Sequence, residues 1–364
     1  MAILKQNNDM AVSPIVATLV LIVVAVIGAV AVGTIMGTFS SDVSKQASAN
    51  GAGTAAQTEI VVAGSTTIDP ITQLMAKGYT VKNPGVKVSS QAMGSGAGVA
   101  AAANGVADIG AASEAMPAKW TNTWPNLKSN LIGYGAIVVI TNKAHPGFVP
   151  TAGKGIAVGD LQNLYNGAAI ANTNGTATTP VAVVRADSSG TADSFFQKFL
   201  NYATNPGAPA GGLAASGNAG MITTVGTTSY AIGFADYGEA VANKLAGNSI
   251  TILPIQDDAA KVYGLTLDTQ DNIYTTGSTT QANWNTLRDQ AKYVYQHDYL
   301  PAYAATDKGK YANGLIRPLL YITNGVPSSS VQNFIEYASN QPYDSDKKIN
   351  IFQETNNFCI ADLG

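Results

Sequence analysis

Residues 15–39 form the longest apolar stretch of the chain, and no charged residue lies between Ala11 and Ser41. A stretch of this length and uniformity is typical of a helix that spans a bilayer. We therefore expect a hydrophobic helix over residues 11–41, after a short polar leader at residues 1–10. This helix lies in a membrane or packs against other copies of itself, because about 25 apolar residues do not stay exposed to water.

The rest of the chain alternates short β-branched runs with helical patterns. Residues 59–63 and 86–91 predict strands, and each is followed by a turn of small, hydroxylated residues and then by a helix. A third run ends at Arg185, before a Ser-Ser-Gly-Thr turn at 188–191 and an amphipathic segment. This alternation predicts an α/β protein with short strands and mainly parallel sheets.

The three turns predict an oxyanion site. Each combines hydroxyl groups with the free N–H groups of a helix start, and the third adds the guanidinium of Arg185. Arginine is scarce, since only Arg185, Arg288 and Arg317 occur, and its planar fork suits a tetrahedral oxyanion. For any one turn taken alone, an ordinary helix cap beside a strand-ending arginine is the alternative.

The order of these motifs resembles the phosphate-binding protein of the phosphate ABC transporter. The runs that carry the resemblance are AGSTT, GSGAG, ADIGA and VVRADSSGT, and the likeness extends from about residue 58 to the C-terminus. It implies a two-lobed type II periplasmic-binding-protein fold of the α/β class. Lobe 1 would comprise residues 58–135 and 238–364, and lobe 2 residues 136–237, with phosphate in the cleft between them.

The resemblance also implies which residues bind phosphate. Asp108 would accept a proton from the ligand, and the other contacts would come from Thr66, Thr67, Ser95, Arg185, Ser189, Gly190 and Thr191. Two positions depart from the family pattern. Thr67 stands where an aromatic residue or valine is frequent, which puts the role of its side chain in doubt, and Ala112 stands where serine is common.

A carboxylate such as Asp108 in an anion site has a chemical consequence. Facing a fully deprotonated oxyanion, a buried carboxylate is repelled and left without a donor. Facing a phosphate that still carries a proton, it is a good acceptor. Asp108 would therefore select phosphate or arsenate over sulfate. The alternative is that Asp108 caps a local turn at the end of a strand.

The N-terminal segment resembles archaeal type IV pilin-like proteins, whose leader is cut before the hydrophobic helix. The cut would fall between Met10 and Ala11, and an uncleaved signal anchor is the alternative. Small residues at every fourth position, Ala25, Ala29, Gly33 and Gly37, make a ridge on which helices can approach closely. A single membrane anchor and a homopolymer through residues 11–41 are both consistent with this pattern. Residues 42–57 predict a linker.

Composition narrows the classes of function. The formal net charge is −3 and the charged fraction is 12%, so nothing indicates nucleic-acid binding. Cys359 is the single cysteine and no metal-ligand cluster or nucleotide-binding loop occurs, so we expect no metal and no cofactor, with a separate permease supplying ATP hydrolysis. We expect a protein of the extracellular membrane face or a surface filament, and not an enzyme. A phosphatase using Ser95 or Ser189 would need a histidine near its nucleophile, and none lies near these turns.

Overall fold

The computed structural model describes most of the chain after the predicted linker. The described residues are 57–149, 155–170, 179–245, 249–253, 255–256, 262–263, 315–340, 342–344 and 349–360. The predicted leader, the hydrophobic helix over residues 11–41 and residues 42–56 lie outside them. Among the helices in the described part of the chain, none combines the length and the apolar character needed to span a membrane.

The first lobe is built around β1, which lies between two parallel neighbours. β1 pairs with β2 on one side and with β3 on the other, although β2 and β3 follow it one after the other in the chain. The connecting helix α2 buries Ile68, Ile71, Met75 and Tyr79, the spacing of a one-sided apolar stripe. In chain order the elements are β1 (Thr58–Gly64), α2 (Ile68–Lys82), β2 (Val86–Ala92), α3 (Ser95–Ala103) and β3 (Ile109–Ala112).

The second lobe repeats this plan around β6. β6 pairs in parallel with β7 on one side and with β8 on the other. The segment after β6 starts as a short α-helix and continues as a π-helix, in which Phe195, Phe196 and Phe199 are buried. In chain order the elements are β6 (Val181–Arg185), α6 (Gly190–Ala192), η1 (Asp193–Phe199), β7 (Leu213–Ala215), α7 (Gly217–Thr227) and β8 (Ala231–Asp236).

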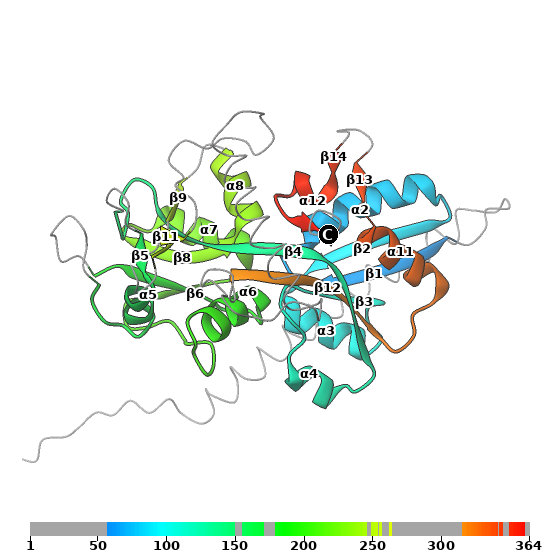
Figure 1. Cartoon of the computed structure of the whole chain (residues 1–364), viewed down its shortest axis with the longest axis horizontal. Coiled ribbons are helices and arrows are strands. Elements are labelled where there is room, and N and C mark those ends of the chain that lie inside the picture. Colours follow the sequence, from blue (N-terminus) through cyan, green and yellow to red (C-terminus); the bar gives the residue numbers. More distant parts are fainter. Residues whose placement is uncertain are drawn as a thin grey trace, which may run out of the picture. The chain divides into compact units, whose positions relative to one another are not determined.

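Two long strands join the lobes into one sheet. β4 (Leu127–Asn142) and β12 (Ile316–Asn324) run antiparallel side by side, and the strand order is β2-β1-β3-β12-β4-β8-β6-β7 (Figure 1). β12 pairs antiparallel with β3, and β4 pairs antiparallel with β8. The expectation of mainly parallel sheets therefore holds for each lobe but is wrong for the centre of the sheet, because two strands cross between the lobes in opposite directions.

Shorter elements cover the sheet and extend its edges. β9 and β15 pair with β4, while β5 lies beside β10 and β10 beside β11 in a small separate sheet. The elements are α4 (Ala118–Thr123), β5 (Ile156–Ala157), α5 (Val158–Tyr165), α8 (Tyr237–Leu245), β9 (Ile250–Leu253), β10 (Ile255–Gln256), β11 (Val262–Tyr263), α11 (Ser329–Ser339), β13 (Tyr343–Asp344), β14 (Ile349–Asn350), α12 (Ile351–Glu354) and β15 (Phe358–Cys359).

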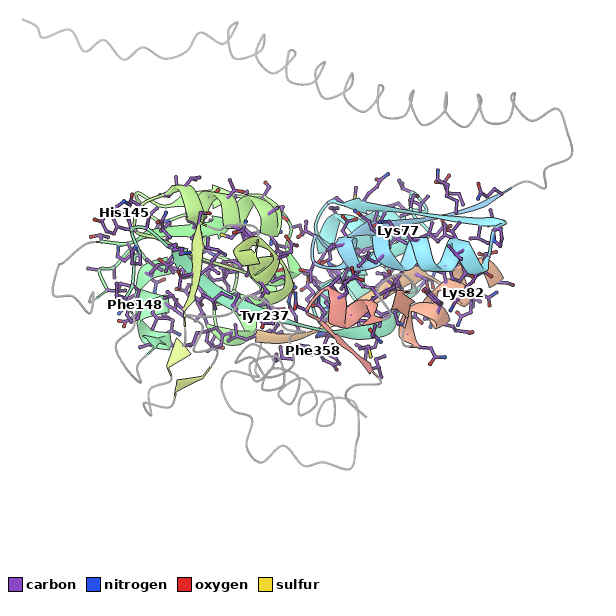
Figure 2. The ribbon with its side chains drawn as sticks, turned by 90° about the horizontal axis from the view of Figure 1, so that it is seen from above. Lys77, Lys82, His145, Phe148, Tyr237 and Phe358 are labelled. Carbon is purple, nitrogen blue, oxygen red and sulfur yellow. The ribbon has the colours of Figure 1, made fainter. Side chains whose placement is uncertain are left out.

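Each lobe has its own apolar core, which supports the two-lobed architecture. One core gathers side chains of β1, α2, β3, β12 and α11. The other extends from Phe148 to Phe358 and Tyr237, which are labelled in Figure 2. This second core also includes Val241 of α8 and Ile252 of β9, which follow position 237, where we expected lobe 2 to end.

Candidate anion site at the junction of the two lobes

The predicted turns after β1 and β6 both lie at points where the strand order reverses. From β1 the chain passes to β2 on one side and then to β3 on the other, and from β6 it passes to β7 and then to β8. Ligands of open α/β sheets bind at such points, beyond the carboxyl ends of the strands. We call the contact between the turns after β1, β2 and β3 and those after β6 and β7 the lobe junction.

Arg185 is the last residue of β6, and its guanidinium is held by two side chains. Its Nε and Nη2 donate to the two carboxylate oxygens of Asp187 at 2.7 and 2.5 Å, and its Nη1 donates to Asn218 Oδ1 at 3.2 Å. A guanidinium has five N–H groups. One N–H on each terminal nitrogen therefore has no partner among the described residues.

The ion pair with Arg185 keeps the carboxyl group of Asp187 ionised. The Arg185 side chain is only 1% exposed. Burial acts to raise the pKa of Asp187, but the hydrogen bonds and charge of Arg185 outweigh it, so the pKa lies below its ordinary value. Asp187 is therefore ionised at neutral pH and holds the guanidinium in one orientation.

Thr67 belongs to a buried hydrogen-bond network that links the lobes. Its Oγ1 accepts from Arg317 Nη2 at 2.9 Å and from Asn218 Nδ2 at 3.0 Å. Two acceptor positions of the hydroxyl are thus used, so its own proton is left to donate. Thr66 is half-buried beside it, and a Cβ on Gly217 would lie 3.4 Å from Thr66 Cγ2.

Ser95 begins α3 and meets the second lobe across the junction. Its Oγ accepts from the backbone N–H of Ser113 at 3.2 Å. A Cβ on Gly190 would lie 2.7 Å from Ser95 Oγ, and one on Gly94 would lie 2.5 Å from the Ser188 carbonyl oxygen. Gly94 also has a backbone φ of +89°, a value that residues with a side chain rarely adopt. The lobes approach so closely here that only glycine fits.

Ser189, Gly190 and Thr191 lie at the start of the segment after β6, as the sequence predicts. Ser189 caps it, since its Oγ accepts from the Ala192 N–H at 3.2 Å. Gly190 and Thr191 are buried in the first turn. The starts of α3 and of this turn therefore face each other, and both present backbone N–H groups.

Asp108 does not join the other predicted residues. It precedes β3, so it lies at the amino end of that strand, whereas the turns of the site lie at the carboxyl ends. It is exposed, and its carboxylate accepts from the backbone N–H of Val61 at 2.8 Å. Asp108 thus ties β3 to the middle of β1, close to the strand-end role that was the alternative, and its assignment to the ligand is corrected.

Glu114 lies at the junction and is an acidic side chain that the sequence analysis did not name. It follows the carboxyl end of β3 and is 6% exposed, and a Cβ on Gly190 would lie 3.0 Å from Glu114 Oε1. Burial and then the neighbouring carboxylate of Asp193 raise the pKa of Glu114 well above its ordinary value. The direction of β3 could have identified Glu114 from the sequence, because only residues after this strand reach the site.

Arg317 on β12 is a second buried arginine of the junction. It donates to the Ser113 carbonyl at 2.7 Å and pairs with Asp236 Oδ2 at 3.1 Å, with side-chain exposures of 1% and 2%. Burial raises the pKa of Asp236 to about 6 and lowers that of Arg317 to about 10, while their attraction opposes both shifts. Both groups stay charged at neutral pH. The sequence indicated no site role for Arg317, Asp236 or Asn218.

Each arginine of the junction thus has its own carboxylate. Glu239 adds a further acid, and burial followed by the charge of Asp236 raises its pKa to about 7. The junction therefore has no surplus of positive charge. An anion would be held by directed N–H and O–H donors, and an anion that carries a proton fits best beside Glu114.

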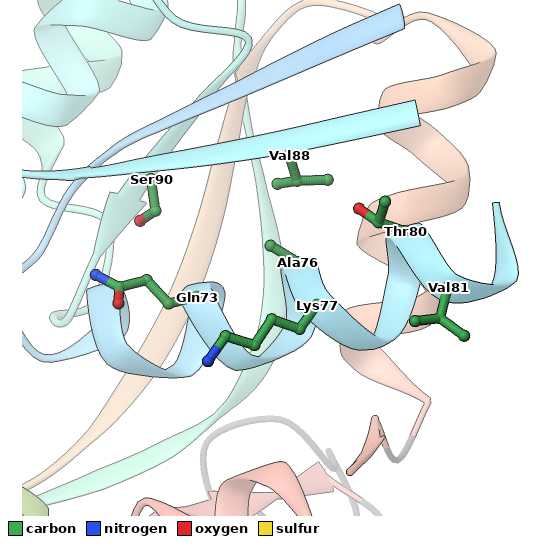
Figure 3. Close-up of a pocket in the computed structure, with 7 residues that line it drawn as sticks. All are labelled: Gln73, Ala76, Lys77, Thr80, Val81, Val88 and Ser90. Carbon is green, nitrogen blue, oxygen red and sulfur yellow. The ribbon is translucent and has the colours of Figure 1, made fainter. Parts of the chain in front are cut away.

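A hollow of the first lobe lies away from these residues. It is an open groove of about 620 Å³ between α2 and β2 (Figure 3), lined by Gln73, Ala76, Lys77, Thr80, Val81, Val88 and Ser90. None of these is a predicted site residue. Within the described ranges, no group of three or more His, Cys, Asp or Glu side chains is placed to hold a metal ion.

Comparisons with known proteins agree with this architecture. A model of the PBP superfamily domain matches residues 47–341. Among curated proteins, none matches the chain significantly.

Solved structures with this fold include two proteins of phosphate transport. A putative phosphate ABC transporter substrate-binding protein from Clostridium perfringens, solved with bound phosphate, shares 20% identity and a TM-score of 0.56 over 83% of this chain and 99% of its own. An ABC-type phosphate transport receptor from Vibrio cholerae shares 22% identity and a TM-score of 0.52 over 82% of this chain and 99% of its own. At these identities the likeness supports the fold.

Proposed function

We propose that this chain, which belongs to the PBP superfamily, binds inorganic phosphate at the lobe junction. The observation that carries the proposal is the guanidinium of Arg185, which is held in place but not fully hydrogen-bonded. Asp187 holds the guanidinium from one side, and two N–H groups are left without a partner in the described part of the chain. They lie in the network that also holds Thr67, at the carboxyl ends of strands where this fold binds its ligands. The C. perfringens protein, which has the same fold, was solved with bound phosphate.

In this proposal the predicted residues, Asp108 excepted, supply the donors. Thr66, Thr67, Ser95 and Thr191 donate through hydroxyl groups, while Gly190 and Thr191 add backbone N–H groups, and Ser189 supports their turn. Arg185 supplies the positive charge and two directed hydrogen bonds.

Glu114 takes the acceptor role that the sequence analysis assigned to Asp108. A phosphate that carries a proton donates it to a carboxyl oxygen of Glu114 and loses no hydrogen bond. Sulfate carries no proton at neutral pH, so it leaves the Glu114 oxygen facing an anion without a donor. Phosphate and arsenate are therefore bound and sulfate is rejected.

Binding of radiolabelled phosphate to the protein stripped of carried-over ligand tests the proposal. We expect one phosphate per chain without added metal, and an excess of sulfate that does not displace it. The variant Arg185→Gln is expected to lose at least about 100-fold in affinity, because two charge-assisted hydrogen bonds are lost and Asp187 is left unpaired.

Lys198→Gln is the matched control, since it also removes one positive charge, from an exposed position of η1. It should leave the affinity unchanged. Absence of phosphate binding by the parent protein, or an equal loss in both variants, would show that the junction is not the anion site.

The proposed role also includes delivery and attachment. Phosphate is captured outside the cytoplasm for a membrane ABC permease, and the apolar residues 11–41 attach the chain to the membrane or assemble copies into a filament. The small-residue ridge favours assembly, so Gly33→Leu should abolish a filament but leave a single anchor in place. Electron microscopy of native surface material and mass spectrometry of its N-terminus, expected at Ala11, distinguish these forms. A native chain that begins after residue 40 would contradict both.

A further inference from the structure

A buried asparagine of the second lobe bonds to residues on both sides of the proposed anion site. Asn218 is the second residue of α7, and none of its side chain is exposed. Its Oδ1 accepts from Arg185 Nη1 at 3.2 Å and from the backbone N–H of Asp236 at 3.4 Å. Its Nδ2 donates to Thr67 Oγ1 at 3.0 Å and to Glu239 Oε1 at 3.1 Å. The amide thus uses all four of its hydrogen-bonding positions.

The direction of the Asn218 amide follows from its partners. A guanidinium and a backbone N–H can only donate, so the amide atom that faces Arg185 and Asp236 must be the oxygen. The nitrogen then faces Thr67 and Glu239. A reversed amide would set its own hydrogens against two other donors. Asn218 therefore presents an N–H to Thr67 and cannot present an acceptor.

The same reasoning fixes the polarity of the Thr67 hydroxyl. Its Oγ1 also accepts from Arg317 Nη2 at 2.9 Å, and that guanidinium has no acceptor. A hydroxyl oxygen accepts at most two hydrogen bonds, and here Arg317 of β12 and Asn218 of α7 supply both. The Thr67 hydroxyl can therefore donate to a ligand but cannot accept from one.

We propose that Asn218 is a positioning residue that fixes the Thr67 hydroxyl as a donor to the anion. The same amide orients Arg185 of the second lobe and Thr67 of the first, so the contact between the lobes sets both donors at once. This inference rests on the proposed function. It adds a rule for the ligand, because the oxygen at Thr67 must be unprotonated, whereas the protonated oxygen lies at Glu114.

Variants of Thr67 separate its hydroxyl group from its shape. Thr67→Val keeps the shape and removes the donor, so phosphate affinity should fall at least about tenfold, as for a lost hydrogen bond to a charged group. Thr67→Ser keeps the hydroxyl and should retain most of the affinity of the parent. Thr227→Val is the matched control, because it removes an exposed hydroxyl at the other end of α7. It should leave the affinity unchanged.

Asn218→Asp tests the positioning role, because it keeps the shape of the side chain and reverses one of its ends. The new carboxylate still accepts from Arg185, but its second oxygen accepts from the Thr67 hydroxyl, whose hydrogen then turns away from the anion. The added negative charge also weakens anion binding by itself. In the Thr67→Val background only this effect of charge remains.

We therefore expect the effects of the two substitutions to be strongly non-additive. Asn218→Asp should lower phosphate affinity by at least about tenfold more in the parent than in the Thr67→Val background. Binding of radiolabelled phosphate to the full chain measures the four affinities, and thermal unfolding checks that each variant is folded. Asn218→Ala, which adds no charge, gives the same comparison if Asn218→Asp does not fold.

Equal losses in the two backgrounds would overturn the inference, because Asn218 would then act on the anion without Thr67. A Thr67→Val variant that binds phosphate as tightly as the parent would overturn it as well. Either result leaves the proposed function standing as long as the parent binds phosphate. A parent that binds none would refute both.

Discussion

The orientation of Arg185 shows how single residues prepare the anion site. Asp187 accepts hydrogen bonds from Nε and Nη2 of the guanidinium, and Asn218 accepts one from Nη1. The Arg185 side chain therefore loses little conformational entropy when an anion binds. Asn218 also donates to Thr67 and to Glu239 Oε1, so one network of hydrogen bonds joins these side chains to Arg185. The donors are therefore arranged before the ligand arrives.

The acidic residue of the site gives the first prediction at this scale. Glu114→Ala removes the acceptor for the phosphate proton, so the preference for phosphate over sulfate should fall at least about tenfold, as expected for a hydrogen bond to a charged group. Asp108→Ala should leave the preference unchanged, because Asp108 is bonded to Val61 away from the junction. Competition binding with both anions measures the ratio. A change in the Asp108 variant alone would restore Asp108 as the discriminating residue.

Glu239 gives a prediction for stability. Its pKa is raised to about 7 in the folded chain, above the ordinary value of 4.5, so the folded state holds its proton over this range while the unfolded state releases it. The unfolding free energy contributed by this group is thus lost as the pH rises from about 4.5 to about 7. Glu239→Gln should remove this loss and stabilise the protein at pH 8 by about 1–3 kcal/mol. Denaturant unfolding at pH 5 and pH 8 checks it, and an equal effect at both values would contradict it.

Residue identities could be predicted from the sequence where a motif and a strand end coincide. Arg185, Ser189 and Thr191 follow directly from the end of β6. The prediction for Asp108 was wrong because Asp108 comes before β3 in the chain. The turns of the junction follow the carboxyl ends of the parallel strands, so only residues after β3 reach it. Arg317 and Asp236 could not be predicted, since they meet only through β12 pairing with β4 far along the chain.

At the scale of elements, each lobe has a turn at the carboxyl end of its central strand, β1 in the first lobe and β6 in the second. β1 lies between β2 and β3, and β6 lies between β7 and β8, the next two strands along the chain in each case. The connections from β1 and β6 therefore leave in opposite directions, and the carboxyl ends of these strands are left uncovered. Local patterns predicted these strands and helices because their apolar periods are regular. The antiparallel crossing of β4 and β12 depends on long-range pairing and was not predicted.

The packing of α3 on β1 gives a prediction for an element. A Cβ on Gly98 would lie 2.2 Å from the Ala63 carbonyl oxygen and from Gly64 Cα, both backbone atoms that cannot move aside cheaply. Gly98→Ala should therefore destabilise the protein by at least about 1–3 kcal/mol. Gly220 of α7 has no atom within 4 Å of its Cβ position, so Gly220→Ala should stabilise it by about 0.5–1 kcal/mol. Thermal unfolding compares the two, and equal effects would show that α3 does not depend on this close approach.

At the scale of the whole binding unit, polar side chains join the two lobes at the junction. Thr67 with Asn218, Lys119 with Asp193, and Arg317 with Asp236 each join side chains that the two central strands bring together. Such contacts can break and re-form with little loss of packing, which suits a fold that opens and closes on its ligand. In the proposed function, the strand order predicts where a ligand would lie, and the polar contacts explain how it would be enclosed.

The central claim, that the junction binds a tetrahedral oxyanion carrying a proton, is tested most directly by a crystal structure of the protein with arsenate. The anomalous signal of arsenic locates the anion without ambiguity. We predict a single arsenate within hydrogen-bonding distance of Arg185, Ser95 and the first turn after Ser189, with one oxygen against Glu114. An empty junction at saturating arsenate, or arsenate bound only elsewhere, would contradict the account.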